Sequence, residues 1–131
     1  MKNHARELYQ CPKCSLTVEI ASPCGCEEPC MRCCGEQLVP VKANTIDAAR
    51  EKHVPVVSRT DNGIAVTVGA EEHPMTEKHH IIWIEASAGN CVMRKYLQPG
   101  DKPYAEFKIC CTKDVTIRAY CNLHGLWENH L

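Results

Sequence analysis

The stretch VPVVSRTDNGIAVTVGA, residues 54–70, decides the fold class because two strand-like runs flank a turn signal. The runs VPVVSRT and IAVTVGA are rich in β-branched residues, which favour strands. The tripeptide DNG (61–63) separates them, and a short polar loop with Asn-Gly is typical of a β-hairpin. We therefore expect an antiparallel hairpin here.

The same kind of pattern continues towards the C-terminus. Four further strand-like runs follow: HIIWIEA (80–86), CVMRKYLQ (91–98), AEFKICC (105–111) and DVTIRAY (114–120). The turn signals SAGN and QPGDKP separate some of them. Short, regularly spaced strands with turn signals predict an immunoglobulin-like antiparallel β-sandwich.

The N-terminal segment differs because it is rich in cysteine and poor in apolar residues. Seven of the eleven cysteines lie between Cys11 and Cys34. Burial alone would not hold so small a module together, so a metal must supply folding energy. SLTVEIA (15–21) alternates like a strand. The predicted fold class is all-β, with a small metal-stapled β module at 1–40 and the β-sandwich at 41–131. TIDAARE (45–51) is expected to form one or two helical turns, with Thr45 as N-cap.

Composition and charge exclude several classes of protein. The net charge of −1 and the pI of about 6.6 give no basic excess for nucleic acid or an anionic membrane. No apolar run approaches the roughly 18 residues of a membrane span. The N-terminus has no apolar core of the signal-peptide type, so we expect a cytoplasmic protein. In that reducing compartment, abundant cysteine indicates metal ligation rather than disulfides.

The first predicted metal site has four cysteine thiolates, and CPKC (11–14) supplies one half of it. Three pairs compete for the other half: Cys30 with Cys33, the vicinal Cys33 with Cys34, and Cys24 with Cys26. Spacing favours the first pair, because 15 residues separate two Cys-x-x-Cys motifs, as in a zinc ribbon. A vicinal pair would distort the site. Tetrahedral sulfur suits iron or zinc.

The second predicted site combines a thiolate with imidazoles. Cys121 and His124 form a Cys-x-x-His pair in AYCNLHGLWE (119–128), and the missing ligands must come from earlier in the chain. The candidates at strand ends or turns are His53, His73 and one of the adjacent pair His79 and His80. Only one of that pair is expected, because neighbours in an extended segment point to opposite faces. Five ligands argue against structural zinc and suit iron or copper with one open position for a small substrate.

Several short segments together carry a family resemblance. CPKC and CCGEQL lie in the first module, and EKHVP, HPM, EKHHIIWIE, PGDKP and YCNLHGLW follow in this order in the second. They resemble desulfoferrodoxin, the two-iron form of superoxide reductase, over nearly the whole chain. The resemblance implies a desulforedoxin-like iron module at 1–40 and a superoxide reductase domain at 41–131. It also implies one-electron reduction of superoxide to hydrogen peroxide, without dioxygen release.

The resemblance implies two iron ions per chain. Against the preference from spacing, the first iron would be held by Cys11, Cys14, Cys33 and Cys34. The second, five-coordinate iron would be held by His53, His73, His79, Cys121 and His124, with the imidazoles in a plane and the thiolate axial. His80 lies where related chains often carry an aromatic residue and is left out.

The resemblance also implies roles for two residues that precede His53. Glu51 would close the oxidised iron site as a ligand, and Lys52 would draw in and orient superoxide. A rubredoxin-type electron donor and a homodimer are implied as partners, and an edge strand of the first module is a candidate dimer contact.

The insertion ASPCGCEEPCM (21–31) departs from the family pattern because it adds Cys24, Cys26 and Cys30. The choice between Cys30 and the vicinal pair therefore stays open, and the sequence assigns no duty to the added thiols. Three further cysteines have no family role and are expected to be buried or half-buried reduced thiols: Cys91, Cys110 and Cys111.

Three other functions compete with a superoxide reductase. One is a non-catalytic two-iron electron-transfer protein, which would need neither an open coordination position nor Glu51 and Lys52. Another is a zinc-ribbon interaction module fused to a β-sandwich. A superoxide dismutase is the nearest rival among enzymes, and it would release dioxygen.

Overall fold

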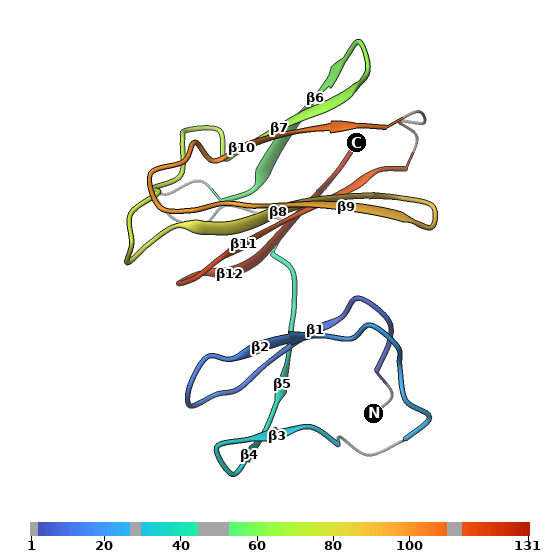
Figure 1. Ribbon diagram of the computed structural model, residues 1–131, viewed down its shortest axis with the longest axis vertical. Helices are drawn as coiled ribbons and strands as arrows, with labels where there is room; N and C mark the ends of the chain where they lie inside the picture. The colour runs from blue at the N-terminus through green and yellow to red at the C-terminus, as the bar shows by residue number, and fades with distance from the viewer. Residues whose placement is uncertain (1–2, 27–29, 45–52, 110–113) are drawn as a thin grey trace. The chain divides into compact units, whose positions relative to one another are not determined.

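The computed structural model describes residues 3–26, 30–44, 53–109 and 114–131, and in these ranges the regular secondary structure is all strand (Figure 1). This confirms the predicted all-β class. The contacts divide the chain into two compact units, Met1–Lys42 and Ala43–Leu131. The expected helical turns at 45–51 lie outside the described residues. The described residues contain no helix that could cross a membrane.

The first unit holds a three-stranded antiparallel sheet and a short hairpin. The sheet has the order β2-β1-β5, with β1 at Leu8–Gln10, β2 at Thr17–Glu19 and β5 at Val39–Val41. The hairpin pairs β3 (Arg32–Cys33) with β4 (Glu36–Gln37). The strand predicted at 15–21 is present as β2. Tyr9, Ile20 and Leu38 form a small apolar cluster in this unit, where Leu8 is buried as well.

The second unit is built from two antiparallel sheets. One has the order β10-β7-β6, with β6 at Pro55–Thr60, β7 at Gly63–Val68 and β10 at Tyr104–Lys108. The other has the order β12-β11-β8-β9, with β8 at Ile81–Ala88, β9 at Cys91–Tyr96, β11 at Thr116–Cys121 and β12 at Gly125–His130. The predicted hairpin at 54–70 is present as β6 and β7.

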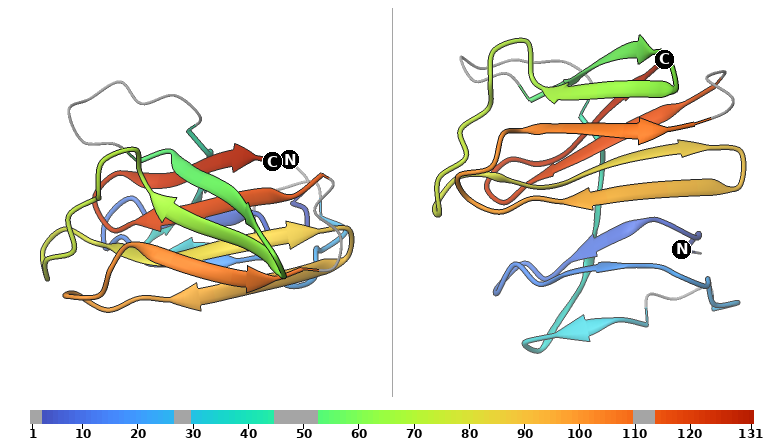
Figure 2. Two further views of the ribbon diagram at one scale, coloured as in Figure 1. Left: turned by 90° about the horizontal axis from the view of Figure 1, so that it is seen from above. Right: turned by 45° about the horizontal axis from the view of Figure 1, so that its top comes forward.

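The two sheets pack face to face around one apolar core (Figure 2). Alternate residues of β7, Ile64, Val66 and Val68, are fully buried, as expected for a strand with one face on a core. They share this core with Ile84 of β8 and Ile117 of β11. The predicted antiparallel sandwich is therefore confirmed.

Antiparallel pairing gathers several strand ends at one end of the sandwich. Pro55 at the start of β6 pairs with Val68 at the end of β7. Cys121 at the end of β11 pairs both with Ile81 at the start of β8 and with Gly125 at the start of β12. Segments that are distant in sequence therefore meet where the histidine-containing turns lie.

The prediction that Cys91 is buried or half-buried is wrong. Cys91 is exposed, because it is the first residue of the edge strand β9 and directly follows the turn at Gly89 and Asn90. Cys110 and Cys111 lie outside the described residues.

Candidate metal centres

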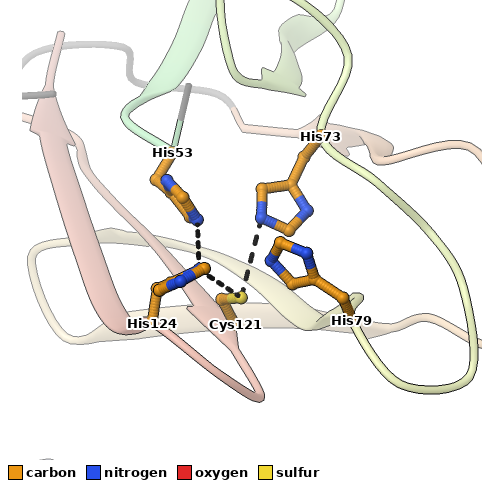
Figure 3. A group of neighbouring side chains, drawn as sticks. All are labelled: His53, His73, His79, Cys121 and His124. Carbon is orange, nitrogen blue, oxygen red and sulfur yellow. Dashed lines mark hydrogen bonds between the residues drawn. The ribbon is translucent and has the colours of Figure 1, made fainter. Parts of the chain in front are cut away.

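Five side chains converge at the end of the sandwich where these strands meet. One possible ligand atom from each lies within 4.8 Å of all the others: His53, His73, His79, Cys121 and His124. Figure 3 shows the four rings and the sulfur pointing toward one another from separate strand ends and turns. His53, His73 and Cys121 are buried, whereas His79 is half-buried and His124 is exposed. Among the described residues, solvent therefore reaches the cluster at His124, whereas Cys121 is enclosed.

Cys121 is the fully buried member of the cluster. The register of β11 against β8 shifts by one residue between Tyr120 and Cys121, so the regular pairing of the two strands is interrupted beside the site. The Cys121 Sγ lies 3.6 Å from His73 Nε2 and 3.9 Å from His124 Nδ1.

His73 is held in one tautomer by the backbone. Its Nδ1 lies 2.7 Å from the carbonyl oxygen of Pro74. A carbonyl can only accept a hydrogen bond, so Nδ1 must carry the hydrogen. The lone pair is then on Nε2, the atom that faces the Cys121 sulfur. This is how a histidine is prepared for a metal by its surroundings.

Asn122 fixes the segment that carries His79. Its side-chain Nδ2 donates to the carbonyl of Lys78 at 2.9 Å, and its Oδ1 accepts from the backbone N–H of His80 at 2.9 Å. One amide thus bonds both neighbours of His79. A turn closed between Thr76 and His79 supports the same segment. The structure brings His79, and not His80, into the cluster.

Trp127 supports the other two histidines. Its ring stacks on His53 with 4.6 Å between the centroids and 18° between the planes. Its Nε1 donates to the carbonyl of His124 at 3.1 Å. His53 Nε2 and His124 Nδ1 lie 3.0 Å apart. Sequence patterns did not single out Trp127 or the side chain of Asn122, although both lie within AYCNLHGLWE, because neither is a usual metal ligand.

The first unit carries a separate cluster of four thiols. The sulfur atoms of Cys11, Cys14, Cys33 and Cys34 all lie within 4.8 Å of one another. The Sγ of Cys33 lies 3.5 Å from that of Cys14 and 3.8 Å from that of Cys34. This grouping contradicts the pairing that spacing favours, since Cys30 lies instead in a third group with Cys24 and Cys26.

The backbone explains how two adjacent cysteines meet in one cluster. Cys34 has a φ of 54° and Gly35 a φ of 75°, so the chain turns through the left-handed region. The opposite-facing rule for neighbours holds only in an extended segment. The turn between β3 and β4 breaks that condition, so both sulfurs reach the same site.

The thiol pKa values show a cluster suited to a cation. The backbone N–H of Cys14 lowers the pKa of Cys11 to about 7, against the opposing effect of burial. Hydrogen bonds with Cys14 and then with Cys11 and Cys34 raise the pKa of Cys33 to about 12. Four neighbouring thiols cannot all ionise without a positive charge among them.

The donor chemistry of both clusters fits iron. A four-sulfur set suits iron or zinc, whereas four imidazoles with one thiolate exceed the four ligands of structural zinc and suit iron or copper. Iron is the metal that both sets accept. Glu51 and Lys52, which precede His53, lie outside the described residues.

The comparisons with known proteins agree with this chemistry. The desulfoferrodoxin family model matches residues 45–130. Desulfoferrodoxin of Syntrophotalea carbinolica is 47% identical over 123 residues, which cover 94% of each chain. Desulfoferrodoxin of Nitratidesulfovibrio vulgaris is 48% identical over 122 residues, 93% of this chain and 94% of that one.

Structural similarity extends over the same range. The crystal structure of the superoxide reductase from Treponema pallidum superposes with a TM-score of 0.69 at 27% identity, and covers 94% of this chain and 95% of that one. With the family match over residues 45–130 and relatives nearly half identical along almost their full length, the chain belongs to the desulfoferrodoxin family.

Proposed function

We propose that this chain is a superoxide reductase. The reaction combines one superoxide, one electron and two protons into hydrogen peroxide, and it releases no dioxygen. The observation that carries the proposal is the convergence of five donors, of which His124 is exposed to solvent, in a chain of the desulfoferrodoxin family. A protein that only carries electrons has no need of a metal site that a small substrate can reach.

The ligand set proposed for the second iron is the five-residue cluster at the end of the sandwich: His53, His73, His79, Cys121 and His124. When bound, ferrous iron supplies the electron and a net positive charge that attracts an anionic substrate. Cys121, the fully buried member of the cluster, would hold the iron as a thiolate and supply electron density to it, since ligand identity is a main lever on such a centre. His73, held by Pro74, keeps its Nε2 lone pair towards the site.

Glu51 and Lys52 are proposed to act on the open side of the cluster. Lys52 would add positive charge that steers superoxide towards the site, and water beside it would deliver protons to the product. Glu51 would close the oxidised site as a ligand. These two roles follow from the family resemblance. They are consistent with the exposure of His124, which lets solvent and small anions reach the cluster.

The proposal extends to the first unit and to partners. Cys11, Cys14, Cys33 and Cys34 would hold the first iron, for which residues 1–40 form the binding module and 41–131 the reducing domain. Each turnover consumes one electron, so an external donor is required, and a rubredoxin-type protein is proposed. A cytoplasmic homodimer is proposed as well. Edge strands β2 and β5 of the first sheet are candidate contacts between copies.

One experiment tests the proposed activity. The iron-loaded, reduced protein is mixed with superoxide, and hydrogen peroxide, dioxygen and iron oxidation are measured together. We expect peroxide to form as the second iron is oxidised, with no dioxygen beyond spontaneous dismutation. Catalytic dioxygen release would indicate a dismutase, and the absence of iron oxidation would indicate a protein without substrate turnover. The Cys91→Ser variant, altered at an exposed thiol outside both clusters, is the matched control.

A further inference from the structure

A third group of thiols lies in the insertion at residues 21–31. The sulfur atoms of Cys24, Cys26 and Cys30 all lie within 4.8 Å of one another, and those of Cys24 and Cys30 are 3.7 Å apart. The group is distinct from the four-thiol cluster, with which it shares no member. All three are free thiols, and an internal disulfide would leave one of them over.

Burial does not explain these cysteines. Cys24 is half-buried, while Cys26 and Cys30 are exposed. A free cysteine that serves as a small apolar residue is among the most buried residue types in proteins. Three thiols gathered near the surface therefore have another role than packing.

Asn3, which precedes Cys24 by 21 residues, contacts it through two hydrogen bonds. Its Oδ1 accepts from the backbone N–H of Cys24 at 3.1 Å, and its Nδ2 donates to the Cys24 sulfur at 3.5 Å. Such a donor stabilises a thiolate and orients it, as the groups around metal ligands do.

The number and type of donors decide the class of ligand. Among the described residues, no fourth Cys, His, Asp or Glu joins the group. Zinc and iron in closed sulfur sites take four ligands in a tetrahedron. A soft closed-shell monovalent ion such as copper(I) prefers thiolates and accepts a trigonal set.

We propose that Cys24, Cys26 and Cys30 bind one soft monovalent metal ion of the copper(I) class, in addition to the two irons. Asn3 acts as a positioning residue that orients Cys24. This site does not depend on the superoxide reductase activity, so either proposal can fail alone.

The test is an anaerobic titration of the iron-loaded, full-length protein with copper(I) against a competing chelator. We expect one copper(I) per chain, with iron content unchanged and three thiols protected from alkylation. Cys24→Ser, Cys26→Ser and Cys30→Ser should each weaken binding by more than about 100-fold, the upper end of effects seen for residues outside the ligand set. Cys91→Ser, which removes an exposed thiol elsewhere, should leave affinity unchanged.

Asn3→Ala adds a readout that a chance group of thiols would not give. It should weaken copper(I) binding by about 10-fold while iron content and the circular dichroism spectrum stay the same. Copper binding that releases iron, or that survives all three serine substitutions, would overturn the proposal. Tighter binding of zinc(II) than of copper(I) to the same thiols would overturn the assignment to a soft monovalent ion.

Discussion

The four-thiol cluster and the five-donor cluster sit on very different scaffolds. Among the described residues of the first unit, one apolar cluster consists of Tyr9, Ile20 and Leu38, with Cys33 itself packed against it. Among those of the second unit, thirteen buried residues form one core, and Cys121 is one of them. The donors of the first unit therefore help to build a fold with a small described core, whereas those of the second project from a sandwich that packing already holds.

This difference separates two uses of metal. A structural site supplies folding free energy directly, because a small module has too little apolar surface to bury. A reactive site needs ligands held in place before the metal arrives, and it needs one side open. The two clusters fit these two uses. Cys11 is buried within the first unit, and His124 is the exposed member of the five-donor cluster.

Removal of iron should have the largest effect, and it should unfold the first unit while the second stays folded. Structural metal binding contributes on the order of 10 kcal/mol in small metal-dependent modules. We expect metal-free protein to lose amide hydrogen-exchange protection in β1, β2 and β5 while β7, β8 and β11 stay protected. Restoring iron should restore the protection of the first unit. Equal protection of both units without metal would remove the proposed distinction.

Substitution of Glu85 tests whether a buried ion group contributes to the stability of the second unit independently of metal. It is 1% exposed, and its carboxylate oxygens lie 2.6 Å from Arg118 Nε and 2.7 Å from Arg94 Nη2. Glu85→Gln removes the negative charge that both guanidinium groups contact, and breaking a buried ion pair of this kind costs about 3–5 kcal/mol. Chemical denaturation of the iron-loaded protein should show this loss for the second unit alone. A loss below about 1 kcal/mol would show that the ion group is not part of what holds the sandwich.

Glu85 also makes the stability of the second unit depend on pH. Burial alone would raise the pKa of Glu85, but the hydrogen bonds and charges of Arg118 and Arg94 outweigh it and lower the pKa. A carboxyl with a lowered folded-state pKa stabilises the fold above its unfolded pKa of about 4.3 and loses that effect as pH falls through the folded value. The stability difference between the parent and Glu85→Gln should therefore be constant at neutral pH and should shrink below about pH 4. A difference that grows on acidification would contradict this assignment.

Local patterns predicted the strands that alternate or are rich in β-branched residues, and missed others. The hairpin of β6 and β7 follows from its own sequence, since its turn and both strands are adjacent in the chain. β12, at Gly125–His130, was missed because GLWENH has no alternation of apolar and polar residues and no β-branched residue, and because its start is part of the turn that carries His124. Its place depends on pairing with β11, which no local pattern encodes.

The donor sets show the same division between local and distant information. Chemistry and spacing identified Cys121, His124 and the candidate histidines, but not which segments meet. Spacing chose Cys30 over the vicinal pair because it carries no information on the positive φ of Cys34. Asn122 and Trp127 were missed because their roles exist only once two turns lie side by side.

Asn122→Ala tests whether the second site is prepared before metal binds. The substitution removes both hydrogen bonds that hold the segment around His79, but it removes none of the five proposed metal ligands. Loss of a supporting group of this kind typically costs 10–100-fold in metal affinity. We expect that loss for the second iron, measured by competition with a chelator, with the first iron unaffected. Thr116→Ala, which removes a side-chain contact with His130 Nδ1 at the end of β11 opposite to Cys121, is the control and should leave iron affinity unchanged.

Lys52→Ala should have the smallest effect. It tests whether superoxide reacts at the five-donor cluster rather than at the four-thiol cluster. Positive charge beside the second site accelerates the encounter with an anion, so its removal should slow superoxide reduction about 10-fold. Both irons should stay bound, and the dependence of the rate on ionic strength should flatten, because salt screens the charge that steers the encounter. Lys13→Ala is the matched control: Lys13 lies beside the first cluster, its Nζ 3.7 Å from Glu36 Oε1, and is exposed. If the two substitutions slowed the reaction equally, the overall charge of the protein, rather than a lysine at the open site, would guide superoxide. If neither did, Lys52 would have no part in the encounter.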